Sequence, residues 1–364
     1  MKRSILALEG ARKSFGEVEA VRGIDLDLEK GRLLVLLGPS RSGKTTLLRM
    51  IAGLERPTEG RIVLEGDDVT RKRLAARDVA CLLSGDTLYP HLSLRENIEL
   101  PLRMGGEGQG ARAQAEKVAA AFGLQKRLHE KPRQLSSADL TRAAIAKAMV
   151  RRARLLLMDE PLAGLTPPLR EELRERIREH QQDTRTTLVF ATEDQTEALA
   201  IADEVAVLVD GELQQRGTPI EVYRQPVNLL VAQLVGAAMN FIAGQVAAGP
   251  SFRSATGQLQ LPLRQHLPVR VGQEVSLGVR PEGMEARPSQ DGMKLPVLKW
   301  EPRGSYNLVH LDSGRGHLRM RTEPKVRPSE GDVLSLHLIE HETHLFDQRS
   351  GVRLGTLAEE PERR

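Results

Sequence analysis

Short apolar runs alternate with longer amphipathic segments over the first two thirds of the chain, as strands and helices do in an α/β domain. Strands are expected at residues 33–37, 62–64, 155–158, 187–191 and 204–208. Helical patterns lie at residues 111–122, 140–150 and 169–181. Three strands, LLVLL, LLLM and TLVFA, are almost continuously apolar, as in parallel strands covered on both faces. We therefore expect these three in the middle of the sheet.

Near Gly236 the pattern changes to short alternating segments, such as EVSLGVR and VLSLHLI, separated by Gly, Pro, Ser and Asp. This pattern is typical of a small all-β barrel or sandwich. We expect an α/β domain over residues 1–235, a β domain over residues 236–357 and a charged tail over residues 358–364.

The composition argues against several classes of protein, above all nucleic-acid-binding and membrane-spanning ones. The 364 residues carry 53 Lys and Arg against 49 Asp and Glu, a surplus too small to indicate a nucleic-acid partner. Six Phe, three Tyr and one Trp leave few rings for stacking on bases. The single cysteine, Cys81, fits a reducing compartment, and no apolar stretch approaches the roughly 18 residues of a membrane span. We expect a soluble protein in the cytoplasm that binds no nucleic acid.

The segment GPSRSGKT, between an apolar strand and a helical pattern, satisfies G-x-x-x-x-G-K-[ST]. Its glycines let backbone N–H groups wrap a di- or triphosphate, Lys44 reaches the β and γ phosphates, and Thr45 offers a hydroxyl to Mg²⁺. The helix N-terminus favours the same anion. The predicted nucleotide-binding residues are Gly38, Pro39, Ser40, Arg41, Ser42, Gly43, Lys44, Thr45 and Thr46.

Adjacent carboxylates, Asp159 and Glu160, follow another apolar strand in LLLMDEP. The carboxyl edge of a parallel sheet is where open α/β folds bind ligands. There, Asp159 can hold Mg²⁺ and Glu160 can polarise an attacking water. Helix capping is the alternative reading of this pair.

Together these segments resemble the ATP-binding subunits of ATP-binding cassette (ABC) transporters, most of all the maltose-type ATPases of sugar and glycerol-phosphate importers. The resemblance rests on KSFGEVEAVRGIDLDL, GPSRSGKTTLLRMIAGLERPTEG, LYPHLSLRENIELPL, MDEPLAGL, DQTEALAIADEVAVL, GTPIEVYRQP, MNFIAG, VSLGVRPE and HLFD. It implies an α/β P-loop NTPase domain with a helical subdomain, followed by a small all-β, OB-like (TOBE) regulatory domain. It also implies ATP and Mg²⁺ as ligands and Phe15 as the ring that stacks on adenine, although Phe15 as an ordinary core residue stays open.

The chain departs from the resembled pattern at four places. Ser84 stands where the family places the Gln that contacts Mg²⁺, and its side chain is too short for that contact. The family's LSGGQ signature, which covers the partner subunit's ATP, reads LSSAD here: Ser136 is kept, but Asp139 brings a negative charge. The family's D-loop aspartate is replaced by Thr166, and its switch histidine by Glu193.

Glu193 is the most consequential departure. A carboxylate about 4 Å from a phosphate charge is disfavoured by roughly 4 kcal/mol at an effective dielectric of 20. Glu193 must therefore turn away, take a proton or weaken the closed state. Losing one donor to developing charge costs about 10² to 10³ in rate, so we expect slow hydrolysis at this site although Glu160 is present.

These observations predict an ATP-binding subunit of an importer, peripheral on the cytoplasmic face of the membrane, with transmembrane permease subunits and, indirectly, a solute-binding protein as partners. The altered motifs favour pairing with a second, more complete ATPase subunit over a homodimer. The alternative is a regulatory subunit that binds nucleotide without hydrolysis. A DNA-repair type of cassette ATPase would need a long coiled coil or a zinc insertion, and neither is visible in the sequence.

Overall fold

A computed structural model describes residues 4–83, 88–106, 108–151, 153–236, 239–286, 292–314 and 316–358. The chain divides into two compact units, residues 1–220 and 221–364. This division falls earlier than the boundary expected after residue 235. The backbone of residues 227–229 hydrogen-bonds with that of residues 351–353, which ties the segment before residue 235 to the second unit.

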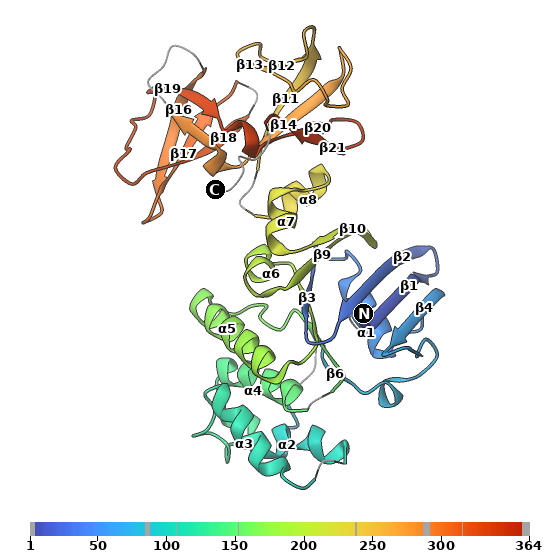
Figure 1. Ribbon diagram of the computed structural model, residues 1–364. Coiled ribbons are helices and arrows are strands. Elements are labelled where there is room, and N and C mark those ends of the chain that lie inside the picture. Colours follow the sequence, from blue (N-terminus) through green and yellow to red (C-terminus); the bar gives the residue numbers. More distant parts are fainter. Residues whose placement is uncertain are drawn as a thin grey trace. The chain divides into compact units, whose positions relative to one another are not determined.

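A six-stranded sheet runs through the first unit in the order β10-β9-β3-β8-β7-β6 (Figure 1). Its strands are β3 (Leu33–Leu37), β6 (Val79–Leu82), β7 (Leu155–Asp159), β8 (Leu188–Thr192), β9 (Glu204–Val209) and β10 (Glu212–Gly217). All neighbours pair in parallel except β10, which is antiparallel to β9. The three continuously apolar runs are β3, β7 and β8. They are fully buried inside the sheet, as predicted.

A second, antiparallel sheet of the first unit has the order β2-β1-β4-β5. It consists of β1 (Ser4–Phe15), β2 (Val18–Glu29), β4 (Glu59–Leu64) and β5 (Asp67–Asp68). The sequence pattern predicted β4 but not the long hairpin of β1 and β2. Register shifts interrupt their pairing at several points, and such irregularities break the alternation of apolar and polar positions.

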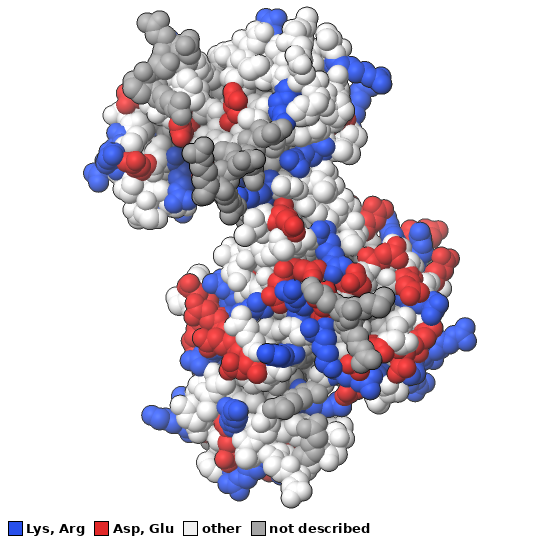
Figure 2. All heavy atoms as spheres, viewed as in Figure 1, with Lys and Arg blue, Asp and Glu red and all other residues white. Residues whose placement is uncertain are grey.

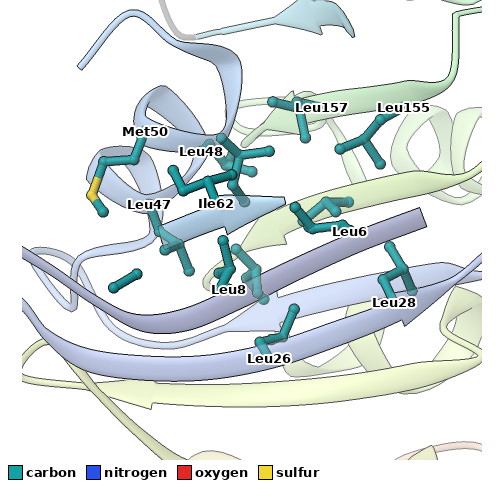
Figure 3. Close-up of a cluster of buried hydrophobic side chains, with 14 of the residues drawn as sticks. Leu6, Leu8, Leu26, Leu28, Leu47, Leu48, Met50, Ile62, Leu155 and Leu157 are labelled. Carbon is teal, nitrogen blue, oxygen red and sulfur yellow. The ribbon is translucent and has the colours of Figure 1, made fainter. Parts of the chain in front are cut away.

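The core of the first unit lies between the two sheets, where helix α1 (Lys44–Ala52) packs (Figure 3). The buried side chains labelled there are Leu47, Leu48 and Met50 of α1, Leu6 and Leu8 of β1, Leu26 and Leu28 of β2, Ile62 of β4, and Leu155 and Leu157 of β7. Because α1 is packed from both sides, the loop that precedes it is held against a rigid support.

Among the described residues of the first unit, further α-helices are α2 (Leu94–Met104), α3 (Ala111–Ala121), α4 (Ser137–Met149), α5 (Pro167–Thr184) and α6 (Gln195–Ile201). Helices α2, α3 and α4 pack on one another as a helical group. The predicted helices correspond to α3, α4 and α5. Helix α2 begins with a capping box of Ser93 and Glu96 and continues through Pro101.

Helix α7 (Pro219–Arg224) spans the boundary between the units in the sequence, and α8 (Leu229–Leu234) follows it. The other described elements of the second unit are strands and 3₁₀ turns. One sheet holds β13 (Gln260–Pro262), β12 (Ser251–Ser254), β11 (Asn240–Ala247), β14 (Glu274–Val279), β20 (Thr343–Asp347) and β21 (Arg353–Thr356). The other holds β15 (Met284–Ala286), β19 (Val333–Leu338), β16 (Met293–Pro302), β17 (Asn307–Asp312) and β18 (His317–Thr322). Apolar side chains of both sheets share one buried cluster, so the predicted all-β barrel-like fold is confirmed.

Candidate functional site: a phosphate cradle

The loop from Gly38 to Gly43 curls between β3 and α1 in a conformation that requires glycine. A Cβ on Gly38 would lie 2.2 Å from the carbonyl oxygen of Leu208, and Gly43 has a φ of 98°. Arg41 also adopts a positive φ of 65°. Both glycines are thus demanded by the geometry of the loop, which brings its backbone to the N-terminus of a packed helix.

Lys44 is fastened beneath this loop. Its Nζ donates to the carbonyl oxygens of Gly38 at 2.8 Å and Pro39 at 3.0 Å. The ammonium also lies 3.5 Å from Oε1 of Glu160 and 3.8 Å from Oε1 of Glu193. Its side chain is only 5% exposed, so the positive charge is fixed inside the cradle.

Thr45 and Asp159, the two residues predicted to hold Mg²⁺, contact each other in the cradle. The Thr45 hydroxyl donates to Oδ2 of Asp159 at 2.8 Å. Burial raises the pKa of the Asp159 carboxyl, and the Thr45 hydrogen bond and the Lys44 charge oppose that rise. Asp159 ends β7, so the rigid sheet sets its position.

Glu160 follows Asp159 with a φ of 48°, an uncommon conformation for a residue with a side chain. Its Oε2 accepts a hydrogen bond from the backbone N–H of Glu193 at 3.3 Å. Burial raises the pKa of Glu160, the charge of Lys44 lowers it, and the neighbouring carboxylates of Glu193 and Asp159 raise it further. The strained backbone aims this carboxylate at the cradle.

Three polar atoms of the cradle are buried and lack a hydrogen-bond partner: Ser42 Oγ, Asp159 Oδ1 and Glu160 Oε1. Buried polar atoms in folded proteins are nearly always paired. Here they lie beside a fixed ammonium and a helix N-terminus, and oxygen atoms are the ligands that Mg²⁺ prefers. The residues present therefore fit a nucleotide phosphate with its Mg²⁺.

A cleft of about 520 Å³ opens over the cradle. Phe15 and Val18 line one end with exposed side chains, 47% and 67% accessible, and Nζ of Lys13 lies 4.7 Å from the centre of the Phe15 ring. The structure thus brings Phe15 into the same cleft as residues 40–46, Glu160 and Glu193. Its role in stacking on adenine stays a prediction.

The sequence analysis missed the residues that the β9–β10 turn brings to this cleft, Asp210 and Gly211. An Asp-Gly pair directly after an apolar strand, here β9, is a hairpin signal that could have located the turn, although not its place beside the cradle.

Glu193 lies in the turn after β8 and points toward Lys44, not away from the site. Its side chain is 51% exposed. The carboxylate thus lies in the cradle with the lysine as its counter-charge, an arrangement that was not among the three outcomes weighed from the sequence.

Ser136 does not line the cleft of its own chain. It caps the N-terminus of α4: its Oγ accepts from the backbone N–H of Asp139 at 3.1 Å and donates to Oδ2 of Asp139 at 2.8 Å. Asp139 is 3.3 Å from Nε of Arg127 and 3.2 Å from Nη1 of Arg142. Arg142 in turn binds Glu172 at 2.8 Å. The extra negative charge of Asp139 is therefore held by two guanidinium groups.

Thr166 is not among the residues that line the cleft over the cradle. Thr166 is the N-cap residue of α5 and makes no capping hydrogen bond through its side chain. Ser84 lies outside the described residues.

The comparisons with known proteins agree with this geometry. A family model described as ABC transporter matches residues 21–163, and one described as MalK OB fold domain matches residues 238–284. The chain is 36% identical over 356 residues to the sn-glycerol-3-phosphate import ATP-binding protein UgpC of Escherichia coli (strain K12), covering 96% of this chain and 99% of that protein. The protein of the same name from Yersinia enterocolitica serotype O:8 / biotype 1B (strain NCTC 13174 / 8081) is 37% identical over 358 residues, with the same coverage.

Among solved structures, the chain is similar to a dimer of the ATP-binding cassette MJ0796 in a post-hydrolysis state bound to ADP and Pi. That likeness has a TM-score of 0.53 and 26% identity, and it covers 59% of this chain and 98% of the other. A second structure, a dimer of MJ0796 described as a bacterial ABC transporter cassette, gives a TM-score of 0.54 with the same identity and coverage.

Proposed function

The chain belongs to the ATP-binding subunits of ABC transporters of the sugar and glycerol-phosphate importer type, and on that premise we propose that it binds Mg-ATP to drive uptake of a carbohydrate, polyol or glycerol-phosphate-like solute. The observation that carries this proposal is the cradle, with its fixed ammonium and three buried polar atoms that make no hydrogen bond. Within the described residues, no helix is both long and apolar enough to span a membrane.

In this proposal Lys44 binds the β and γ phosphates, while Thr45 and Asp159 hold Mg²⁺, which when bound would neutralise phosphate charge. Phe15 supports the adenine ring at the other end of the cleft. Glu160 orients and polarises a water near the terminal phosphate. Ser136, on α4, contacts the nucleotide held by a partner subunit.

We further propose that this chain's own hydrolytic site is impaired. Glu193 occupies the position of the family's switch histidine. Its carboxylate lies 3.8 Å from Nζ of Lys44 and, while ionised, cannot donate a hydrogen bond to the terminal phosphate. Ser136 gives its hydroxyl hydrogen to Asp139, so that hydrogen is committed within the chain. Glu193 weakens the stabilisation of developing charge at this chain's own site, and Ser136 does so at the partner's site, whose nucleotide it covers. Neither feature removes the groups that bind phosphate.

Pairing with a second ATPase subunit follows from these defects. In a homodimer each nucleotide would meet both Glu193 and an altered signature. In a mixed dimer the partner's intact signature would cover this chain's cradle, and the partner's cradle would keep its own switch residue. The partner's cradle would face this chain's altered signature, so a mixed dimer divides the defects between its two sites, whereas a homodimer carries all of them at both.

A groove of about 660 Å³ on the helical group is the proposed docking place for the permease. It is lined mostly by apolar side chains from β6, α2 and α4, including Leu100, Met104 and Ala148. Met104 is 79% exposed. We propose Met104→Asp as the test, with Val271→Asp as matched control because Val271, in the second unit, is 71% exposed. Only the Met104 variant should lose co-purification with the permease, while nucleotide binding is kept; equal loss in both would contradict the assignment.

A regulatory subunit that binds nucleotide without hydrolysis is the second candidate, and the Lys44–Glu193 ion pair favours it. The assembled transporter separates the two. With the permease and a second ATPase present, Glu160→Gln in this chain should lower turnover slightly if its site is impaired and not at all if the site only regulates. The same change in the partner's catalytic glutamate should abolish turnover. If Glu160→Gln in this chain removes half of the turnover or more, the site is fully catalytic and the claim of impairment is wrong.

A further inference from the structure

Lys44, the lysine of the P-loop, is paired with carboxylates of the chain itself. Nζ of Lys44 gives two of its three hydrogens to the carbonyl oxygens of Gly38 and Pro39. The remaining direction faces two carboxylates, Glu160 at 3.5 Å and Glu193 at 3.8 Å. The positive charge of the cradle is therefore already outnumbered by negative charge before any nucleotide enters.

The two carboxylates are held differently. The Glu160 side chain is 27% exposed and also accepts the backbone N–H of Glu193. The Glu193 side chain is 51% exposed, and the described hydrogen bonds give its carboxylate no partner that would hold it beside Lys44 other than the lysine itself. Glu193 is thus the group that an incoming anion must displace or tolerate.

ADP and ATP differ in the negative charge that they would bring to Lys44. Lys44 reaches the β and γ phosphates in the motif it belongs to. A diphosphate needs only the contact to its β phosphate, and the Lys44–Glu193 pair can persist beside it. A triphosphate brings its γ phosphate, with its additional negative charge, to the place where the Glu193 carboxylate meets the ammonium.

We propose that Glu193 substitutes for the terminal phosphate at Lys44, so that this site selects nucleoside diphosphates over triphosphates. This inference rests on the proposed nucleotide site and assigns its ligand preference. At equal concentrations of the two nucleotides, this site would then hold mainly ADP, although it also binds ATP.

The test measures the ratio of the dissociation constants for ADP and for the non-hydrolysable analogue adenosine 5′-(β,γ-imido)triphosphate, by calorimetry on the full chain with Mg²⁺. The unmodified chain should bind ADP about tenfold more tightly than the analogue. In Glu193→Gln, which keeps the size and removes the charge, the analogue should gain about tenfold while ADP changes by less than threefold.

Glu19→Gln is the matched control. Glu19 lines the same cleft, but its carboxylate pairs with Arg12 at 2.8 Å instead of with Lys44. It removes the same charge from the cleft and should leave the ratio unchanged. Raising the salt concentration should reduce the preference of the unmodified chain, because the discrimination is electrostatic. Thermal unfolding of each variant verifies that it is folded.

The outcomes separate this inference from the proposed function. If neither nucleotide binds the unmodified chain, the nucleotide site itself is wrong. If both bind and Glu193→Gln leaves their ratio within twofold, or Glu19→Gln moves it equally, the selectivity assigned to Glu193 is wrong and the nucleotide site stands. If Glu193→Gln does not fold, Glu193→Ser is measured in the same way, and an unchanged ratio there overturns the inference.

Discussion

The phosphate cradle and the signature segment, residues 135–139, differ in whether their polar groups find hydrogen-bond partners within the chain. In the cradle, Ser42 Oγ, Asp159 Oδ1 and Glu160 Oε1 are buried without hydrogen-bond partners. In the signature segment, Ser136 and Asp139 bond to each other, and Asp139 also pairs with two arginines.

This difference indicates which region still serves a ligand. Unpartnered buried groups cost stability and persist where a ligand satisfies them. Internally paired groups contribute to the fold and have little left to offer a nucleotide. The cradle therefore has the features of a binding site, whereas the polar groups of the signature segment are bound within the chain, which would weaken their contact with a partner's nucleotide.

Both signs of charge are interspersed over the face of the first unit seen in Figure 2. Because the charges on that face are mixed, its electrostatic field does little to steer an anionic nucleotide toward the protein. Binding strength must then come from the local groups of the cradle, which the following changes probe.

The largest expected effect is that of Lys44→Ala. The change removes the buried ammonium that the loop carbonyls hold in the cradle. Nucleotide affinity should fall at least about 100-fold, or about 2.7 kcal/mol, because charge-assisted contacts to phosphate are lost. Isothermal calorimetry measures this. Lys13→Ala, which removes a cation near the Phe15 ring, serves as the control and should change affinity far less.

His344, in the second unit, also has a buried polar atom without a hydrogen-bond partner, and it allows the cost of such an atom outside the cradle to be measured. Burial, with the charges of Arg353 and Arg280, lowers the pKa of His344 to about 3 from 6.5, and its Nδ1 has no hydrogen-bond partner. Because the unfolded chain takes up a proton below pH 6.5 and the folded chain does not, stability is lost as the pH falls. Between pH 7 and pH 5 this single group removes about 2 kcal/mol.

Urea unfolding of the full chain at several pH values measures the effect, and His344→Leu should flatten the slope for the second unit. If the slope is the same with and without His344, the histidine is not buried in its neutral form.

Replacing one aspartate by asparagine in each region should have opposite effects on stability and on nucleotide binding. Asp139→Asn breaks the pairs with Arg127 and Arg142 and should lower the free energy of unfolding by about 1–2 kcal/mol, since these partners are partly exposed. It should leave nucleotide binding by the isolated chain unchanged. Asp159→Asn should show the reverse: unchanged or higher stability with weaker Mg-dependent binding. Thermal unfolding and calorimetry on both variants decide, and the comparison fails if their effects are alike.

How far the sequence predicts these features depends on how local they are. The buried runs of β3, β7 and β8 and the loop motif are contiguous, so they could be located without a structure. Helix α2 was not predicted, because Pro101 inside it marks an expected helix end. The pairing of Asp139 with Arg127 and Arg142, and of Glu193 with Lys44, depends on tertiary packing, which spacing along the chain does not encode.

The smallest expected effect is a gain. Glu193→His removes the carboxylate from Lys44 and adds a group able to hydrogen-bond the γ phosphate, so hydrolysis at this site should rise about tenfold in a mixed dimer whose partner supplies an intact signature. Adding Glu160→Gln should erase the gain, because the amide cannot polarise water in the same way. A gain that persists with Glu160→Gln, or no gain at all, would show that the site lost its chemistry for another reason.

The central claim, that the cradle binds nucleotide while the switch and signature positions no longer support rapid hydrolysis, is tested most directly on the purified chain alone. Binding of Mg-ATP and steady-state release of phosphate are measured on the same preparation. We predict saturable binding that Lys44→Ala abolishes, with turnover far below the ~1 per second at the lower end of the ordinary enzyme range. Turnover of about 1 per second without a partner, or binding unchanged in Lys44→Ala, would contradict the account.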